Sequence, residues 1–285
     1  MEYIMSEIIT TFEPDNSLKK GYLSIFTEIF HELDRSKWLT YQLFKRNFLT
    51  IYKQSFLGIL WSLIIPLVSV GTFIALNQSG IFTIGDINVP YPIYAILGMA
   101  FWQLFATGLV ASSNSLVSAG AMIAKINFSK KALVFASTGQ SLVSFIIQII
   151  LAGILFVYYG VAPGMAILLI PVVIIPLILL TLGLGFIFAL LNGVARDIGN
   201  IISVLMTFLM FLTPVLYSKP TSGILAQVTD YNPLYHLVSA PRSLILEGGY
   251  PQWEGFLAAS VISCIVFIIC LIIFHLTETR VAERI

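Results

Sequence analysis

Charged side chains are scarce in this chain, and their scarcity decides its broad class. Only 10% of the 285 residues are Asp, Glu, Lys or Arg, whereas 58% are hydrophobic and the mean hydropathy is +0.94. A soluble globular domain carries roughly 25% charged residues. Five intervals lack Asp, Glu, Lys and Arg altogether: 54–85, 87–124, 132–195, 198–218 and 255–277. The sequence therefore predicts an integral membrane protein.

Cysteine, histidine and phosphate-binding motifs are equally sparse. Cys264 and Cys270 share the last apolar interval and the three histidines are scattered, which suggests neither a disulfide framework nor a metal site. The motif G-x-x-x-x-G-K-[S/T] is absent, because the dipeptide Gly-Lys never occurs. We expect no cofactor in this chain, so if the protein works with ATP and Mg²⁺, a partner subunit must bind them.

Charge is also missing where ion-coupled carriers and membrane enzymes would need it. Proton or ion relays place ionisable groups inside the bilayer, and acid–base or metal-assisted chemistry needs paired carboxylates or a metal site there. The apolar intervals offer neither, and no internal repeat of the kind found in secondary transporters is visible. The composition does not favour a secondary transporter or an intramembrane enzyme.

The apolar intervals predict six transmembrane helices, because each span needs about 20 apolar residues. The longest interval breaks at YYGVAPG, residues 158–164, where Gly and Pro mark a turn, and it therefore holds two helices. The predicted spans are 56–76, 93–117, 132–158, 165–191, 198–216 and 256–274. Basic loops remain in the cytoplasm, and with both termini inside only Lys219 and Arg242 of the 15 basic residues lie outside. We expect an N-in, C-in topology.

The regions flanking the spans carry features of their own. A cytoplasmic N-terminal region, 1–54, includes an aromatic and basic stretch at 38–53, typical of an amphipathic helix lying in the membrane interface. That helix could serve only as an anchor or could also meet a partner or a lipid headgroup. The transmembrane domain, 55–276, contains a cytoplasmic loop at 118–132, and a cytoplasmic tail follows at 277–285.

An extracytoplasmic region at 218–254 precedes the last span, and its apolar pieces are too short to cross a membrane. Pro233 and Pro241 could each begin a short helix, with Gly248 and Gly249 ending the second. Two short re-entrant helices would suit this pattern, provided that protein or a water-filled cavity surrounds them. An ordinary surface cap is the alternative.

Neutral polar and aromatic side chains occur together within the predicted spans. Such groups suit a sugar chain, which stacks on rings and exchanges hydrogen bonds, but they also concentrate where membrane helices pack. For any single residue, helix packing is the better interpretation. The neutral residues are Ser112, Ser113, Asn114, Ser115, Ser118, Thr138, Gln140, Ser141 and Gln148.

Four ordered motifs carry a resemblance to a known family. They are YKQSFLGILWSLIIPL (52–67), GVARDIGNII (193–202), LTPVLYS (212–218) and YNPLYHLV (231–238). Together they resemble the membrane subunits of ABC-2 type exporters of polysaccharides, the group that contains O-antigen, capsule and teichoic-acid permeases. The resemblance extends over about residues 38–274.

The resemblance implies the partners and the location of the protein. It implies a homodimer of six-helix subunits in the bacterial inner membrane, associated with two copies of a separate ABC ATPase subunit. The chain would be a transport subunit and not an enzyme, and its cargo would be a lipid-linked glycan. It would contact membrane lipids, and no nucleic acid would be a partner.

The resemblance also implies roles for particular residues. The cytoplasmic loop at 118–132 would contact the ATPase through a protruding segment flanked by lysines. These lysines could also serve only to keep the loop on the cytoplasmic side. An anionic headgroup entering from the cytoplasm would meet cations of the interface helix, and Arg242 could receive it outside or remain a surface residue. The coupling residues are Lys125, Ile126, Asn127, Phe128, Lys130 and Lys131; those at the interface are Trp38, Arg46 and Lys53; those along the substrate path are Tyr94, Trp102, Phe105, Tyr217, Tyr235 and Arg242.

Three alternative functions remain open on the sequence. The chain could be the permease of an ABC-2 drug or lipid exporter, which would differ in cargo and not in topology. It could be a membrane enzyme of glycan assembly, in which Asp86, Asp230 or Glu247 would be essential. It could also be a structural anchor, which would tolerate changes in its outer region.

Overall fold

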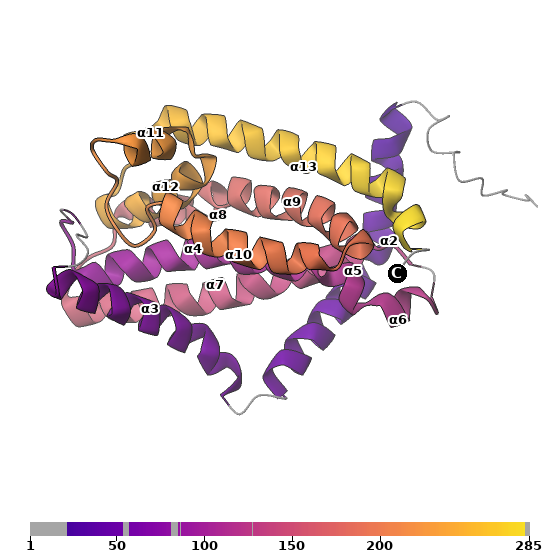
Figure 1. Ribbon diagram of the computed structural model, residues 1–285, viewed down its shortest axis with the longest axis horizontal. Coiled ribbons are helices and arrows are strands. Elements are labelled where there is room, and N and C mark those ends of the chain that lie inside the picture. Colours follow the sequence, from indigo (N-terminus) through magenta and orange to yellow (C-terminus); the bar gives the residue numbers. More distant parts are fainter. Residues whose placement is uncertain (1–21, 54–56, 81–84, 86, 127, 283–285) are drawn as a thin grey trace, which may run out of the picture.

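The computed structural model describes residues 22–53, 57–80, 85, 87–126 and 128–282, and within these ranges the chain forms helices and turns but no strand. The long helices lie roughly side by side, with α11 and α12 at one end and α5, α6 and the C-terminus at the other (Figure 1). The all-helical class is confirmed for this part of the chain. In order, the elements are α2 (Tyr22–Lys53), η1 (Gly58–Leu60), α3 (Trp61–Gln78), α4 (Tyr91–Ser113), α5 (Ser115–Ser118), α6 (Gly120–Ile123), α7 (Lys131–Tyr159), η2 (Met165–Leu169), α8 (Ile170–Val173), α9 (Ile175–Val194), α10 (Asp197–Leu212), α11 (Ile224–Tyr231), α12 (Pro233–Glu247) and α13 (Trp253–Ala282).

Six apolar helices fall at the six predicted spans. Among the described residues, four are long and apolar enough to cross a membrane: Tyr91–Ser113, Lys131–Tyr159, Met165–Val194 and Trp253–Glu278. Leu63–Gln78 and Asp197–Leu212 are shorter; a helix of 16 residues is about 24 Å long, less than the ~30 Å hydrocarbon core. The chain is a multi-pass membrane protein, while the count of six spans and the N-in, C-in topology stay predictions.

The break between the third and fourth predicted spans is confirmed. Helix α7 ends at Tyr159, and the next residue, Gly160, takes the left-handed conformation at φ 65°, which glycine adopts without steric cost. The following run is divided into η2, α8 and α9, with proline in the first turn of both α8 and α9. Proline has no N–H to donate, so helices begin rather than continue at such positions.

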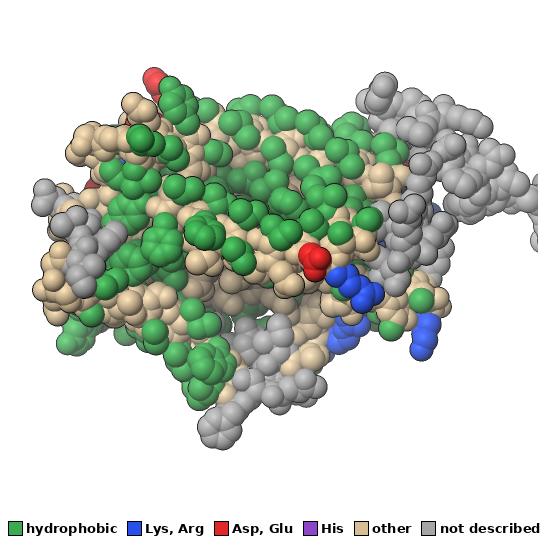
Figure 2. Space-filling model, in the orientation of Figure 1, with side chains coloured by type: hydrophobic (Ala, Val, Ile, Leu, Met, Phe, Trp, Pro, Cys, Tyr) green, Lys and Arg blue, Asp and Glu red, His purple; other side chains and the backbone are tan. Residues whose placement is uncertain are grey.

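Helix α4 lies at the centre of the bundle, packed against α7 and α9, and α13 packs on the other side of α9. Most side chains of α4 are buried, whereas α7, α10 and α13 expose apolar residues such as Val157 (85%), Phe208 (64%) and Leu257 (60%). Figure 2 shows hydrophobic side chains over the middle of one face, with Lys and Arg gathered near α5 and α6. Such a continuous apolar surface is expected where lipid covers the protein.

Small and neutral polar residues hold the central helices together. The Oγ atoms of Ser112 and Thr138 lie 2.6 Å apart between α4 and α7, and Gln148 Nε2 donates to Gln103 Oε1 at 2.9 Å. Gly185 lets α9 approach so closely that an added Cβ would lie 2.7 Å from Ser112 Cβ. These contacts match the helix-packing interpretation of the neutral polar residues.

Two short helices do precede the last span, but one predicted start is wrong. Pro233 begins α12 and Gly248 ends it at φ 74°, as expected, whereas Pro241 lies inside the helix. A proline there removes one backbone hydrogen bond. The helix nevertheless continues because most of its residues are buried, against α4, α13 and η2. The first short helix is instead α11, and the re-entrant position of both stays a prediction.

Candidate functional site

The end of the bundle that carries α11 and α12, called the outer end after the predicted topology, is organised around the chain segment that follows α10. Two tyrosines of α4 hold this segment by hydrogen bonds to its backbone. The hydroxyl of Tyr91 donates to Leu216 O at 3.0 Å, and that of Tyr94 donates to Tyr217 O at 2.9 Å. The segment therefore lies across the N-terminal end of α4.

Arg242 of α12 ties the same segment down from the other side. Its Nη1 donates to Val215 O at 2.7 Å, and its Nη2 donates to Pro214 O and Ser239 Oγ, both at 3.3 Å. The residue is only 4% exposed, and within the described ranges it forms no ion pair with a carboxylate. Backbone carbonyl oxygens thus replace the water that a buried guanidinium loses.

Glycine at position 98 makes this arrangement possible. A Cβ added to Gly98 would lie 2.3 Å from Val215 O, closer than Cβ atoms approach in proteins, and 3.0 Å from Arg242 Nη1. The backbone of α4 therefore touches the segment that Arg242 holds.

A small polar cavity of about 160 Å³ opens beside these residues. Lys219 forms an ion pair with Asp230, and its Nζ lies 5.6 Å from the centre of the Tyr235 ring. Burial raises the pKa of both Tyr217 and Tyr235 above the ordinary value, although Arg242 opposes part of the increase at Tyr235. The hydroxyls therefore stay protonated at neutral pH. The lining residues are Ile87, Asn88, Val89, Tyr94, Ser218, Lys219, Tyr235, Ser239, Arg242, Ser243, Leu246 and Glu247.

The structure brings together four of the six residues predicted along the substrate path. Tyr94, Tyr235 and Arg242 line the cavity, and Tyr217 accepts the bond from Tyr94. Trp102 and Phe105 do not lie there. They are 3% and 1% exposed in the core, with ring centroids 5.9 Å apart. Helix α4 is surrounded by other helices of this chain at their depth, and their place on a substrate path stays a prediction.

At the opposite end, called the inner end after the predicted topology, the predicted coupling loop follows α5 and forms α6 and a turn. Lys125 and Ile126 are exposed, Ile126 to 58%, and Phe128 is half-buried. Asn127 lies outside the described residues. The tip of the loop thus offers one cation and one apolar side chain to the surroundings.

The two lysines that follow the loop do not share this exposure. Lys130 is 9% exposed and Lys131 is fully buried. Lys131 Nζ donates to Glu32 Oε2 of α2 at 2.7 Å and forms a second ion pair with Glu278 of α13. Lys131 therefore does not face the surroundings, because a buried ammonium must remain with its carboxylates, and its part in coupling stays a prediction.

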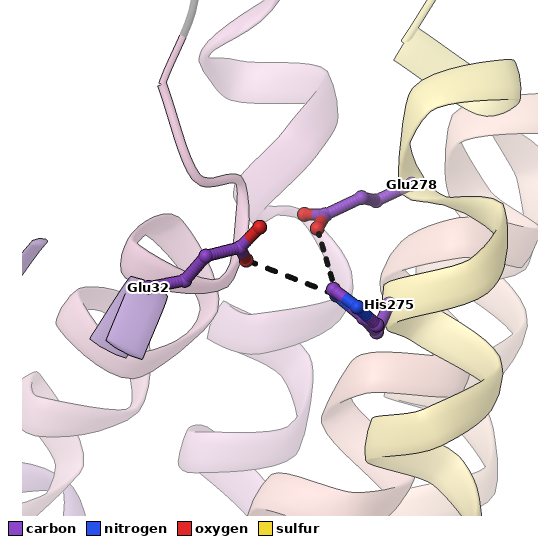
Figure 3. Close-up of side chains that lie close together, drawn as sticks. All are labelled: Glu32, His275 and Glu278. Atoms are coloured by element: carbon purple, nitrogen blue, oxygen red, sulfur yellow. Dashed lines mark ion pairs between the residues drawn. The ribbon is translucent and has the colours of Figure 1, made fainter. Parts of the chain in front are cut away.

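His275 lies beside the same two carboxylates, as Figure 3 shows. Its Nδ1 is 3.8 Å from Glu32 Oε2 and 3.8 Å from Glu278 Oε1, and its side chain is 7% exposed. Sequence analysis missed Glu32, His275 and Glu278. The only local signal is the i, i+3 spacing of His275 and Glu278, since Lys131 is 99 residues from Glu32 and 147 from Glu278.

The predicted interface helix is part of α2, which is one continuous helix from Tyr22 to Lys53. It packs on α7 and leaves Trp38 and Tyr41 exposed to 69% and 57%, as an aromatic anchor at a membrane surface would be. Exposed Arg46 contacts Met122 of α6, with 3.6 Å between Nη1 and Sδ. The side chain of Lys53 lies outside the described residues.

Comparison with known proteins places this architecture among transporter subunits. A family model described as "ABC-2 type transporter" matches residues 39–246. The O-antigen export system permease protein RfbA of Myxococcus xanthus is 27% identical over 259 residues, which cover 89% of this chain and 98% of that protein. Two proteins of the same name from Klebsiella pneumoniae are 28% and 27% identical, each covering 81% of this chain and 89% of the relative.

Proposed function

The chain belongs to the ABC-2 type transporter family, and we propose on that premise that it is the permease subunit of an ATP-driven exporter of lipid-linked polysaccharide. The observation that carries the choice of cargo is its similarity, over most of its length, to permeases named for O-antigen export. As a member of this family it is a transport subunit rather than an enzyme. We further propose that it works as a homodimer with two ATPase subunits in the inner membrane.

The chemistry of the outer cavity supports a hydroxylated cargo. Tyr94 and Tyr235 offer aromatic faces, Ser218, Ser239 and Ser243 offer hydroxyls, and Arg242 supplies a buried positive charge. Sugar rings stack on aromatic faces, and phosphate oxygens accept hydrogen bonds from guanidinium groups. For a drug exporter in the same family, we would expect a cavity lined mainly by apolar side chains.

The inner end supports a docking role for the loop. Lys125 and Ile126 are exposed at its tip, and Arg46 connects the interface helix to α6. An ATPase that contacts this loop would therefore act on α2 at the same time. Trp38, Arg46 and Lys53 are proposed to meet the anionic headgroup of the cargo at the cytoplasmic interface.

Co-purification tests the partnership directly. The tagged chain is extracted in mild detergent from its native membranes, and an ABC ATPase is sought by mass spectrometry. We expect the ATPase with the wild type and its loss with Lys125→Glu/Ile126→Asp. Ile224→Asp is the matched control, because Ile224 is 82% exposed at the other end and should leave the complex intact.

Two results would redirect the proposal. An ATPase retained by Lys125→Glu/Ile126→Asp would keep the exporter but remove the docking role of those residues. No ATPase with the wild type would contradict the exporter and favour an enzyme of glycan assembly. Neutralising Asp230 or Glu247 would then abolish function, although Asp230 already pairs with Lys219.

A further inference from the structure

Three elements of the inner end meet at one group of charges, in which Lys131 and Glu278 are buried and Glu32 is partly exposed. Glu32 comes from α2, Lys131 is the first residue of α7, and His275 and Glu278 lie one turn apart on α13. Figure 3 shows the side chains of Glu32, His275 and Glu278 pointing toward one another. The coupling loop ends where this group begins, since Lys131 is the first residue of the helix that follows the loop.

Burial makes these contacts obligatory. Lys131 is 0% exposed and Glu278 6% exposed, so water cannot replace either partner if the two separate. Breaking a buried ion pair by removing one member leaves an uncompensated charge in an apolar medium, which is strongly unfavourable. The side chain of Glu32 is 37% exposed, so its contact with Lys131 is less strictly enforced. A displacement of Lys131 must therefore carry Glu278 along or break the buried pair, and it also acts on Glu32.

The charges in the group do not balance without a proton. Two carboxylates and one ammonium leave one negative charge in excess. Within the described part of the chain, both ring nitrogens of His275 are buried and have no hydrogen-bond partner, and Nδ1 lies 3.8 Å from each carboxylate. Glu32 from α2 and Glu278 from its own helix face the imidazole, and Lys131 from α7 lies between these carboxylates. Protonation of His275 would bring the group to neutrality.

We infer that Lys131, Glu32 and Glu278 form a charge lock that positions the end of the coupling loop on α2 and α13, and that a proton on His275 tightens it. All four are positioning residues. The role in coupling rests on the proposed function, because the lock would transmit the displacement of the loop by the ATPase to two further helices. The role of the lock in holding the end of the loop on α2 and α13 rests on the geometry alone.

A divalent metal is the competing occupant of this group. Glu32, His275 and Glu278 offer ligand atoms within 4.8 Å of one another, a set that carboxylate- and imidazole-binding metals use. Lys131 Nζ, however, already binds both carboxylates. A metal ion would have to displace a buried ammonium that has no other described partner.

Limited proteolysis of the purified chain tests the positional part without the ATPase. Trypsin cleavage after exposed Lys125 is followed by mass spectrometry for wild type, Lys131→Glu, Glu278→Lys and the double exchange. We expect each single variant to be cleaved about fivefold faster or more, on the scale of coupling between contacting charges, and the double exchange to return toward wild type. Lys37→Glu/Asp34→Lys, which reverses an exposed pair, is the control.

The milder variants Lys131→Arg and Glu278→Gln cover the case in which charge reversal prevents folding. Cleavage after Lys125 should stay slow in Lys131→Arg and should be faster in Glu278→Gln. Equal cleavage rates in wild type and Glu278→Gln would overturn the lock. If a chelator accelerates cleavage of wild type but not of Glu32→Gln, the group is a metal site and not a charge lock.

The proton is tested by the pH dependence of the same cleavage. As the pH is lowered, cleavage at Lys125 relative to the control variant should slow in wild type and stay constant in His275→Gln. A wild-type profile identical to that of His275→Gln would remove His275 from the lock.

Coupling is measured in proteoliposomes that contain the complete complex, as ATP hydrolysed per cargo exported. Glu278→Gln should raise this ratio about fivefold or more, while Lys131→Arg should leave it near the wild-type value. A fast-cleaved variant with an unchanged ratio would overturn the coupling role. If wild type shows the lock in proteolysis but binds no ATPase, the proposed function is contradicted. The positioning role of the lock would still be supported.

Discussion

The guanidinium carbon of Arg242 lies 4.0 Å from the centre of the Tyr94 ring, which joins α12 to α4 across the segment that follows α10. A cation over an aromatic face is attracted by the ring's quadrupole. Because Arg242 also binds Val215 O and Pro214 O, one side chain connects three parts of the outer end. The cavity therefore depends on this contact for its shape.

Replacement of Arg242 by methionine should destabilise the protein. Methionine fills similar space but leaves Val215 O and Pro214 O without their donor, and an unsatisfied buried acceptor costs about 1–3 kcal/mol. Thermal unfolding in detergent should show a lower Tm, with Arg196→Met, an exposed arginine, unchanged. A Tm equal to that of wild type would show that Arg242 does not support the outer segment.

Gly98→Ala should displace the segment around Val215. The new Cβ would lie 2.3 Å from Val215 O, so the segment or α4 must move. Gly71→Ala is the matched control, since a Cβ at Gly71 meets nothing within 4 Å and alanine favours a helix interior by ~1 kcal/mol. We expect a lower Tm and slower export for Gly98→Ala only; equal behaviour of both variants would contradict the close packing.

Aromatic residues at the cavity and in the core should respond differently to alanine. Tyr235→Ala should slow export per assembled subunit, because a stacking surface at the cavity is lost. Trp102→Ala should instead lower the amount of folded protein, since removing a buried tryptophan costs about 3–5 kcal/mol. Export assays normalised to the membrane-inserted chain separate the two effects. Unchanged export by Tyr235→Ala would end the role of Tyr235 in the substrate path.

Stability should fall in alkali as the buried tyrosines of the outer end are forced to ionise. Burial raises the pKa of both Tyr235 and Tyr250, so the folded state holds these protons more tightly than the unfolded chain. Their contribution to stability is complete below about pH 10, the unperturbed tyrosine pKa, and is lost as the pH rises further. Tyr250→Phe should show a smaller decline in Tm above that pH than wild type; an equal decline would contradict the buried phenol.

Local patterns were sufficient to predict the apolar helices but not all their limits. The break near Gly160 and the start at Pro233 were correct because glycine and proline act on their own backbone. Pro241 was misjudged as a helix start, since burial of α12 outweighs the loss of one hydrogen bond. The last helix also continues to Ala282, beyond the apolar stretch, because Glu278 finds a partner in Lys131.

The candidate sites divide in the same way. The structure brings Tyr94, Tyr217, Tyr235 and Arg242 together at one end of the bundle, and their part in a substrate path stays a prediction. Trp102 and Phe105 could not be assigned from sequence, since the inward and outward faces of α4 differ little in hydropathy. Only packing decides which aromatic ring touches lipid, cargo or another helix.

By itself, the sequence determined that this is a membrane protein with apolar helices in these places, because partition into a bilayer depends on runs of about 20 residues. The tertiary structure alone decided that Lys131 is buried between Glu32 and Glu278. Those partners lie 99 and 147 residues away, and no local pattern specifies them. Their meeting depends on how α2, α7 and α13 pack, and it turns a lysine that looks topological into part of a buried charge group.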